Sequence, residues 1–225
     1  MTLYRITGLV LIGLPIAFNL VFLALGRTFS YPDILRQPTD TILKRFTAGG
    51  TRLIALWYAF AMTAVLAIPM ALLFQQIFVQ QQPALASASA IIGVLSGLVQ
   101  AMGLLRWPLL VPILAAQYND VATTPEQRSA VAVVFNAFHQ YVGVVIGEHL
   151  GYLFTGTWTI LISVMMVNSP IFSPFMALFG IISAIGVMVG LLEPTGWKPA
   201  GMINAISYLV WSLWLIVSGI ILILK

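Results

Sequence analysis

Residues 84–116 read ALASASAIIGVLSGLVQAMGLLRWPLLVPILAA, and Arg106 is the only charged residue among them. A helix that crosses a hydrocarbon layer about 30 Å thick needs about 20 consecutive apolar residues. This stretch is long enough, and its apolar residues are continuous rather than alternating as in the strands of a membrane barrel. We therefore predict a transmembrane α-helix here.

The composition of the whole chain extends this prediction. Of its 225 residues, 60% are hydrophobic and 7% are charged, and the mean hydropathy is +1.03. A soluble domain of this length could not cover its surface with so few polar groups. Comparable apolar runs occupy residues 6–26, 53–79, 84–116, 129–167, 171–192 and 202–224. The sequence predicts an all-α fold, a polytopic bundle of about six transmembrane helices in one domain over residues 1–225.

Charge and cysteine content exclude several functions. The net charge of +4 comes from ten Lys and Arg residues spread thinly along the chain, which does not form the dense basic face that nucleic acid requires. The absence of cysteine excludes disulfides and thiolate metal sites. We expect membrane lipids, and partner subunits or further copies of the chain, as the binding partners, and the sequence identifies no cofactor and no metal site.

The fourth run is too long for one simple crossing. Residues 124–127 read TPEQ, a typical helix start with Thr as the cap, Pro at the first helical position and Gln at the third. The next strong stop is the Asn-Ser-Pro sequence at 168–170. A helix over 125–167 would be about 64 Å long, twice the hydrocarbon thickness. We predict that the segment 125–140 extends beyond the bilayer or lies along its surface.

Basic residues predict the orientation of the chain. One side of the predicted topology carries Arg27, Arg36, Lys44, Arg45, Arg52, Arg128 and Lys198, and the other carries Arg5 and Lys225. Short loops rich in Lys and Arg stay in the cytoplasm. Both termini are therefore predicted to lie outside, with the loop 27–52 in the cytoplasm.

The loop 27–52 has an amphipathic pattern. Apolar residues at 34, 35, 42, 43 and 46 are interspersed with charged ones. A helix lying in the membrane interface would use them in this way. A solvated loop with a few buried anchors fits the same pattern, and the sequence leaves both alternatives open.

Two charged residues lie within the predicted spans, where charges are costly and are default candidates for function. Arg106 precedes the end of the third run by about 15 Å, and Glu148 follows the entry of the fourth run on the same side by a comparable distance. The two can therefore share one depth. They could form a structural salt bridge, or line a cavity in which Arg106 holds an anion or Glu148 exchanges a proton. Alternatively Arg106, beside Trp107, could extend to the membrane interface.

Further polar residues follow the fourth run. Tyr152, Thr155 and Thr159 continue a stripe from Glu148 at helical spacing, and Tyr141 lies two turns before Glu148. This stripe is the predicted wall of a cavity.

Small residues and histidines complete the candidates on this run. Gly143, Gly147 and Gly151 recur every four residues and predict close helix packing. His139 is a candidate site residue, although a packing role fits it better than a ligand role. His139 and His149 are ten residues apart and diverge, so they cannot ligate one haem iron from this helix.

Several segments together resemble an uncharacterised family of bacterial multi-pass membrane proteins that is known as a domain of unknown function. They are residues 31–46, GLLRWP at 103–108, GEHLG at 147–151 and YLVWSLW at 208–214. The resemblance implies a six-span protein of the bacterial inner membrane. It implies no activity and no ligand set.

Three functional hypotheses follow. The first is membrane-embedded binding or transport of a small molecule or ion around Arg106 and Glu148. The second is a non-catalytic structural or regulatory subunit of a larger membrane complex, because no complete catalytic set is present. The third is a membrane-embedded enzyme that uses Glu148 as acid or base, assisted by Tyr141 or His139.

Overall fold

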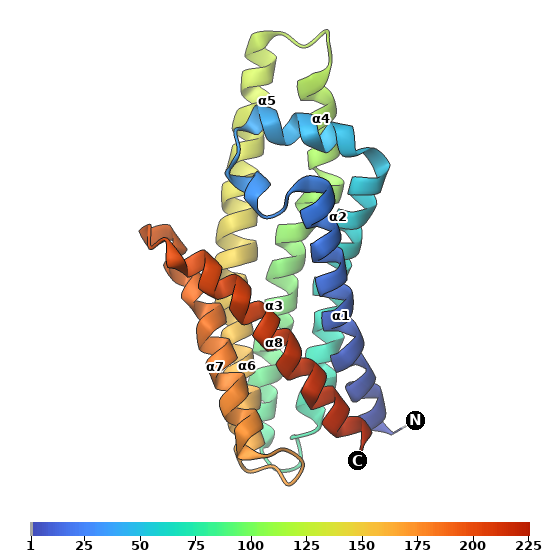
Figure 1. The fold of residues 1–225 in the computed structure, drawn as a ribbon, viewed down its shortest axis with the longest axis vertical. Helices are drawn as coiled ribbons and strands as arrows, with labels where there is room; N and C mark the ends of the chain where they lie inside the picture. The colour runs from blue at the N-terminus through green and yellow to red at the C-terminus, as the bar shows by residue number, and fades with distance from the viewer. Residues whose placement is uncertain (1) are drawn as a thin grey trace. The chain divides into compact units, whose positions relative to one another are not determined.

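The computed structural model describes residues 2–225, of which the helices form the great majority. The α-helices are α1 (Leu3–Phe29), α2 (Thr39–Gln76), α3 (Pro83–Leu109), α4 (Val111–Asn119), α5 (Pro125–Phe138), α6 (Gly151–Val167), α7 (Pro174–Met188) and α8 (Pro199–Ile223) (Figure 1). Two 3-10 helices, η1 (Asp33–Arg36) and η3 (Val189–Thr195), and a π-helix, η2 (His139–Leu150), complete the order. Within 2–225 there is no strand, which confirms the all-α prediction.

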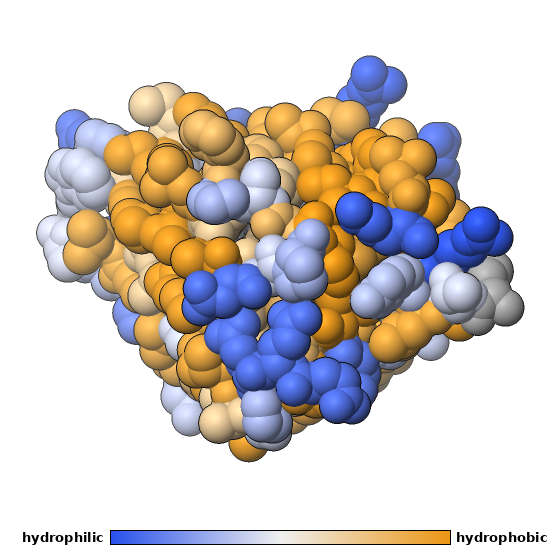
Figure 2. All heavy atoms as spheres, turned by 90° about the horizontal axis from the view of Figure 1, so that it is seen from below, coloured by the Kyte–Doolittle hydropathy of each residue, from blue (hydrophilic) through white to orange (hydrophobic). Residues whose placement is uncertain are grey.

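Six helices in the described part of the chain are long and apolar enough to cross a membrane. They are Leu3–Phe29, Thr39–Gln76, Pro83–Asn119, Pro125–Val167, Pro174–Thr195 and Pro199–Ile223. The six predicted spans are confirmed, with most boundaries within a few residues. Large apolar side chains such as Leu20, Ile91 and Leu209 lie exposed, and Figure 2 shows hydrophobic side chains covering much of the face it displays, with hydrophilic ones in patches. Lipid is the solvent that such a surface requires.

The second span begins earlier than predicted because the loop before it is helical. A kink at Gly50 divides α2, and its φ of 54° and ψ of −154° lie in a region that is open essentially to glycine alone. The part before the kink runs across the direction of the part after it (Figure 1). Ile42, Leu43 and Phe46 on this first part are buried in the protein. The amphipathic pattern thus forms a helix, but its apolar face packs against protein.

The fourth span has the predicted start and length. Thr124 and Gln127 form a capping box, in which the Thr124 side chain accepts from the Gln127 N–H and the Gln127 side chain accepts from the Thr124 N–H. The helical segment runs over 43 residues from Pro125 to Val167. Its extension beyond the bilayer stays a prediction. The structure differs in its middle, where η2 replaces the expected α-helix.

Prolines break the third span as their positions suggest. α3 ends at Leu109 and α4 starts at Val111, with Pro108 and Pro112 on either side of the break. Proline lacks the N–H that would continue the helical hydrogen bonds and crowds the preceding turn. The break follows the turn that carries Arg106.

The chain forms two compact units. The first comprises Met1–Ala17, Ala64–Val99 and His149–Lys225, and the second comprises Phe18–Thr63 and Gln100–Glu148. Several long helices contribute residues to both units. The prediction of a single domain over 1–225 stays a prediction.

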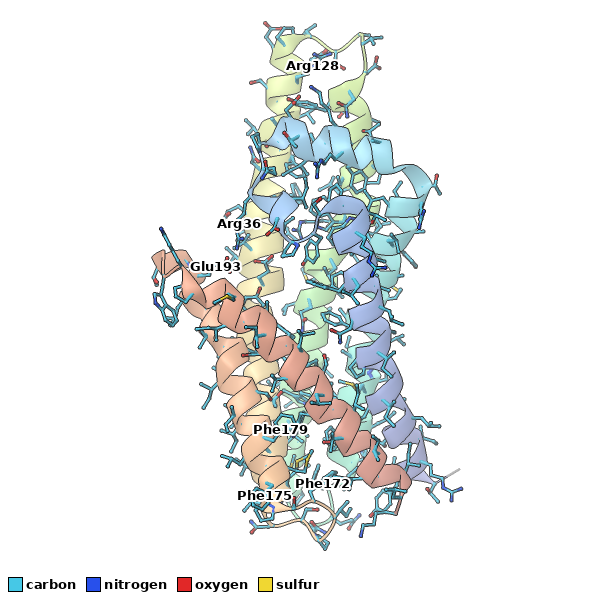
Figure 3. All side chains as sticks on the ribbon, in the orientation of Figure 1. Arg36, Arg128, Phe172, Phe175, Phe179 and Glu193 are labelled. Carbon is cyan, nitrogen blue, oxygen red and sulfur yellow. The ribbon has the colours of Figure 1, made fainter. Side chains whose placement is uncertain are left out.

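In the first unit, α6 packs against α7 and α7 against α8. Buried aromatic side chains form its core, including Phe74, Trp158, Phe172 and Trp214. Phe175, in the first turn of α7, is 82% exposed (Figure 3). Side-chain hydrogen bonds join its helices: Ser96 with Thr155 at 2.8 Å, Trp211 Nε1 to Thr159 Oγ1 at 2.8 Å, Asn204 Nδ2 to the Val187 carbonyl at 2.6 Å and Trp214 Nε1 to the Met176 carbonyl at 3.0 Å. Polar side chains in this unit thus hold helices together.

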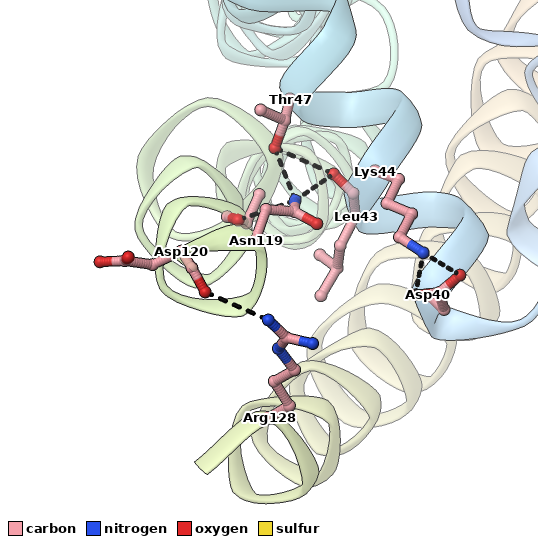
Figure 4. Close-up of polar contacts among 8 residues, drawn as sticks. Asp40, Leu43, Lys44, Thr47, Asn119, Asp120 and Arg128 are labelled. Atoms are coloured by element: carbon pink, nitrogen blue, oxygen red, sulfur yellow. Dashed lines mark hydrogen bonds and ion pairs between the residues drawn. The ribbon is translucent and has the colours of Figure 1, made fainter. Parts of the chain in front are cut away.

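In the second unit, the first part of α2 is joined to α4 by Asn119. The Asn119 Nδ2 atom donates to the Leu43 carbonyl at 3.2 Å and to Thr47 Oγ1 at 2.8 Å (Figure 4). Arg128 on α5 donates to the Asp120 carbonyl at 3.2 Å across the connection between α4 and α5. The loop predicted over 27–52 is therefore an ordered part of this unit.

Candidate functional site

Arg106 lies in the last turn of α3, inside the second unit. Its neighbour Trp107 is 1% exposed and stacks on Trp57 with ring centroids 4.6 Å apart. The Arg106 Cζ atom lies 5.3 Å from the Trp107 ring centroid, which is within the range of a cation–π contact. Arg106 itself is only 9% exposed. The guanidinium is therefore held within the protein and not at its surface.

Two hydrogen-bond partners of the guanidinium lie on α3 and η2. Arg106 Nη1 donates to the Gly103 carbonyl, three residues earlier in the same helix. Arg106 Nη2 lies 3.4 Å from His139 Nδ1. Because arginine has no acceptor, His139 Nδ1 must accept, and the proton of the neutral imidazole then resides on Nε2.

Aromatic rings fix the position of the His139 imidazole. The ring stacks on Phe135, with centroids 5.6 Å apart and an interplanar angle of 13°. It also meets the Trp107 ring edge-on at 6.3 Å. His139 therefore combines the packing role expected from the sequence with a polar contact to Arg106.

The Glu148 carboxylate and the Tyr31 phenol both interact electrostatically with the Arg106 guanidinium. The structure thus brings together Arg106, His139 and Glu148 from the predicted site. Tyr31 is a member that the sequence did not indicate. It comes from the segment between α1 and η1, and only the folding of that segment within the second unit brings it near Arg106.

Glycines on η2 allow this close approach. A Cβ atom at Gly143 would lie 2.4 Å from Arg106 Nη2 and 2.5 Å from its Cζ. A Cβ atom at Gly147 would lie 2.8 Å from the Gly103 Cα atom, and one at Gly103 would lie 2.6 Å from the Gly147 Cα atom. The first glycine makes room for the guanidinium, and the other two let the helix backbones touch. Gly151 is buried at the start of α6.

The π-helix changes which residues share a face. Its hydrogen bonds join residues five apart, so each turn holds more residues than an α-helical turn. The sequence placed Tyr141 beside Glu148 on α-helical spacing, but Tyr141 is 64% exposed. Tyr152 lies in the first unit, where its ring meets that of Tyr208 at 5.9 Å. The cavity wall predicted along Glu148, Tyr152, Thr155 and Thr159 stays a prediction.

A hollow of about 200 Å³ lies elsewhere in the second unit, at Ser30, Asp33, Ile34, Gln37, Thr41 and Arg45. Across residues 2–225, no three His, Asp or Glu side chains are grouped so that they could hold a metal ion. The chemistry available at Arg106 is that of a fixed positive charge beside an imidazole and a carboxylate. Such a group can hold a small anion or exchange a proton.

The fold and this site define a class: a polytopic α-helical membrane protein with a buried arginine beside a half-buried histidine and a half-buried glutamate. The family model of the domain of unknown function DUF4386 matches residues 6–219. The chain belongs to the DUF4386 family, which confirms the resemblance seen in its sequence. No curated protein and no solved structure matches it.

Proposed function

We propose that this protein binds or transports a small ion or molecule at a polar site inside the membrane, formed by Arg106, His139 and Glu148. The observation that carries the proposal is the contact of the buried Arg106 guanidinium with the half-buried His139 imidazole, 3.4 Å away, together with the electrostatic interaction between Arg106 and Glu148. Ionisable groups are expensive within a bilayer and mark ion and proton pathways when they occur there.

The three groups have complementary roles in this proposal. The Arg106 guanidinium stays charged at all physiological pH values and acts as a fixed positive charge. Glu148 and His139 are the groups that can release it, by taking up a proton or by moving. A small anion would then take their place on the donors of Arg106.

The local backbone supports the proposal. π-Helical segments are rare, and they occur frequently at functional sites. The π-helix η2 carries His139, Gly143 and Glu148 within its 12 residues. The segment that departs from α-helical geometry is thus the one that faces Arg106.

The experiment is an ion-flux measurement in liposomes that contain the purified protein. Chloride and proton movements are followed for the native protein, Arg106→Gln and Glu148→Gln, with Arg128→Gln as the control because Arg128 lies exposed on α5. We expect both site variants to lose at least tenfold in rate while Arg128→Gln keeps it. If both variants match the native protein in flux and in quenching of tryptophan fluorescence by chloride and nitrate, the proposal is wrong.

We also propose that the membrane is the bacterial inner membrane and that both termini lie outside. The basic residues of the segment 27–52 support this orientation. The native chain has no cysteine, so Ala122→Cys and Lys225→Cys each introduce one thiol. In whole cells, an impermeant maleimide should label Lys225→Cys and spare Ala122→Cys. Labelling of Ala122→Cys and not of Lys225→Cys would show that the termini lie in the cytoplasm and that the proposed orientation is wrong.

A structural or regulatory subunit is the second candidate, and a specific observation favours it. The backbones of Gly103 and Gly147 are in contact, and Arg106 is nearly enclosed. Such packing suits a set of charged groups that stabilises the fold. Purification in mild detergent distinguishes the two candidates. A subunit should retain a stoichiometric partner, whereas an ion-binding or transport protein should purify alone and still conduct ions in liposomes.

A further inference from the structure

The hollow in the second unit is lined by groups of both charges and by neutral polar groups. Its sides carry one guanidinium, from Arg45, and one carboxylate, from Asp33, together with hydroxyl and amide groups of Ser30, Thr41 and Gln37. Ile34 also contributes to the lining and is 1% exposed. The volume of the hollow, about 200 Å³, is below the range of about 300–1,000 Å³ that is usual for the binding sites of drug-sized ligands. The hollow suits a small group that bears both charges.

The surrounding backbone builds this hollow. Ser30 has a φ of 55°, which is uncommon for a residue other than glycine, and its carbonyl accepts from the Ile34 N–H at 2.9 Å. Arg45 Nη1 donates to Ser30 Oγ at 3.0 Å. This bond joins the first part of α2 to the end of α1 and uses one of the five N–H donors of Arg45.

The sequence places the hollow at the surface of the bilayer. The apolar helix α1 ends at Phe29, with Arg27 in its last turn, and Ser30 follows directly. The chain returns to an apolar span only after the kink at Gly50. We therefore expect residues 30–45 at the depth of the lipid headgroups.

We propose that this hollow binds the headgroup of a zwitterionic phospholipid. The phosphate accepts hydrogen bonds from the Arg45 guanidinium and from the hydroxyls of Ser30 and Thr41, and the ammonium group lies against Asp33. A charge-assisted bond to phosphate is among the stronger hydrogen bonds in proteins. The site is separate from the one proposed at Arg106.

Arg36 is the competing cation for Asp33. Its Nη1 atom lies 3.8 Å from Asp33 Oδ1, and both side chains are largely exposed, at 67% and 85%. Figure 3 labels Arg36. An exposed ion pair of this length contributes little. A headgroup ammonium can therefore displace it, whereas phosphatidylglycerol has no cationic group that could pair with Asp33.

The test measures lipid retention by native mass spectrometry of the full chain, stripped of lipid and offered phosphatidylethanolamine or phosphatidylglycerol. The variants are Arg45→Gln and Asp33→Asn, and the control is Lys44→Gln. Lys44 is exposed next to Arg45 but is paired with Asp40 at 2.9 Å, outside the lining of the hollow. All variants are checked for an unchanged thermal unfolding temperature.

We expect the native protein and Lys44→Gln to prefer phosphatidylethanolamine. Arg45→Gln should lose about tenfold in affinity for both lipids, which is the effect of one charge-assisted bond. Asp33→Asn should lose the preference and keep phosphatidylglycerol binding. Equal retention of both lipids by the native protein, or equal losses in Lys44→Gln and Arg45→Gln, would overturn the proposal. Displacement of the lipid by millimolar free phosphoethanolamine would overturn the assignment to a lipid.

Discussion

The guanidinium of Arg106 lies directly against Gly143, where a Cβ atom would stand 2.4 Å from Nη2. The group that would be displaced is the end of a long side chain, and the backbones need not move. Alanine at this position should therefore disturb the polar site more than the fold.

Gly143→Ala is the first prediction. We expect Arg106 to be pushed from His139, with a loss of ion flux and a decrease in stability of about 1 kcal/mol, the lower end for an overpacked site. Thermal unfolding in detergent and the flux measurement check it. Gly13→Ala is the matched control, because nothing lies within 4 Å of a Cβ atom there. Addition of Arg106→Gln to Gly143→Ala should restore most of the lost stability, and a purely additive loss would contradict this account.

Gly147→Ala should be more destabilising than Gly143→Ala. The Cβ atom at Gly147 would meet the backbone of Gly103 at 2.8 Å, and neither partner has a flexible end that can move aside. We expect a cost of about 2–3 kcal/mol, because two helices must separate. The unfolding temperatures of the two variants, measured side by side, decide the order.

Gly50→Ala should destabilise the kink in α2. The φ of 54° and ψ of −154° cost about 1–3 kcal/mol for a residue with a Cβ atom. Space is not the cause, since nothing lies within 4 Å of a Cβ atom at Gly50. The same Gly13→Ala control applies. Unchanged stability would show that the backbone at this position differs from the one described.

Asn119→Ala should loosen the first part of α2 and leave the spans folded. Asn119 Nδ2 donates to the Leu43 carbonyl and to Thr47 Oγ1 on α2. It also donates, at 2.9 Å, to the Ala115 carbonyl one turn earlier in α4. Its loss should cost about 1–2 kcal/mol locally. Hydrogen exchange should rise over residues 39–49 and remain the same in α6. A uniform rise along the chain would contradict a local role.

The spans were predictable because burial in lipid demands long apolar runs, and the runs are visible residue by residue. Thr124 and Gln127 likewise predict the start of α5, because a capping box depends only on local sequence. The π-helix was not predictable in this way. In the segment 139–150 the polar residues lie only at its two ends, with a run of Gly, Val and Ile between them. Their spacing therefore cannot show five residues to a hydrogen bond instead of four.

The candidate site was predictable in part. Arg106 and Glu148 stand out because charges are rare in the spans. Counting residues from the ends of the two spans predicts that both lie at a similar depth. Tyr31 lies far away in sequence, and only the tertiary packing of the loop brings it to Arg106. Tyr141 was assigned to the site on α-helical spacing, which η2 does not follow.

The π-helix also affects how far the fourth span can reach. An α-helix of 43 residues is about 64 Å long, but turns that take up more residues advance less along the axis for each residue. The segment from Pro125 to Val167 is therefore shorter than its residue count suggests. The predicted extension of residues 125–140 beyond the bilayer is therefore expected to be shorter than α-helical geometry alone would give.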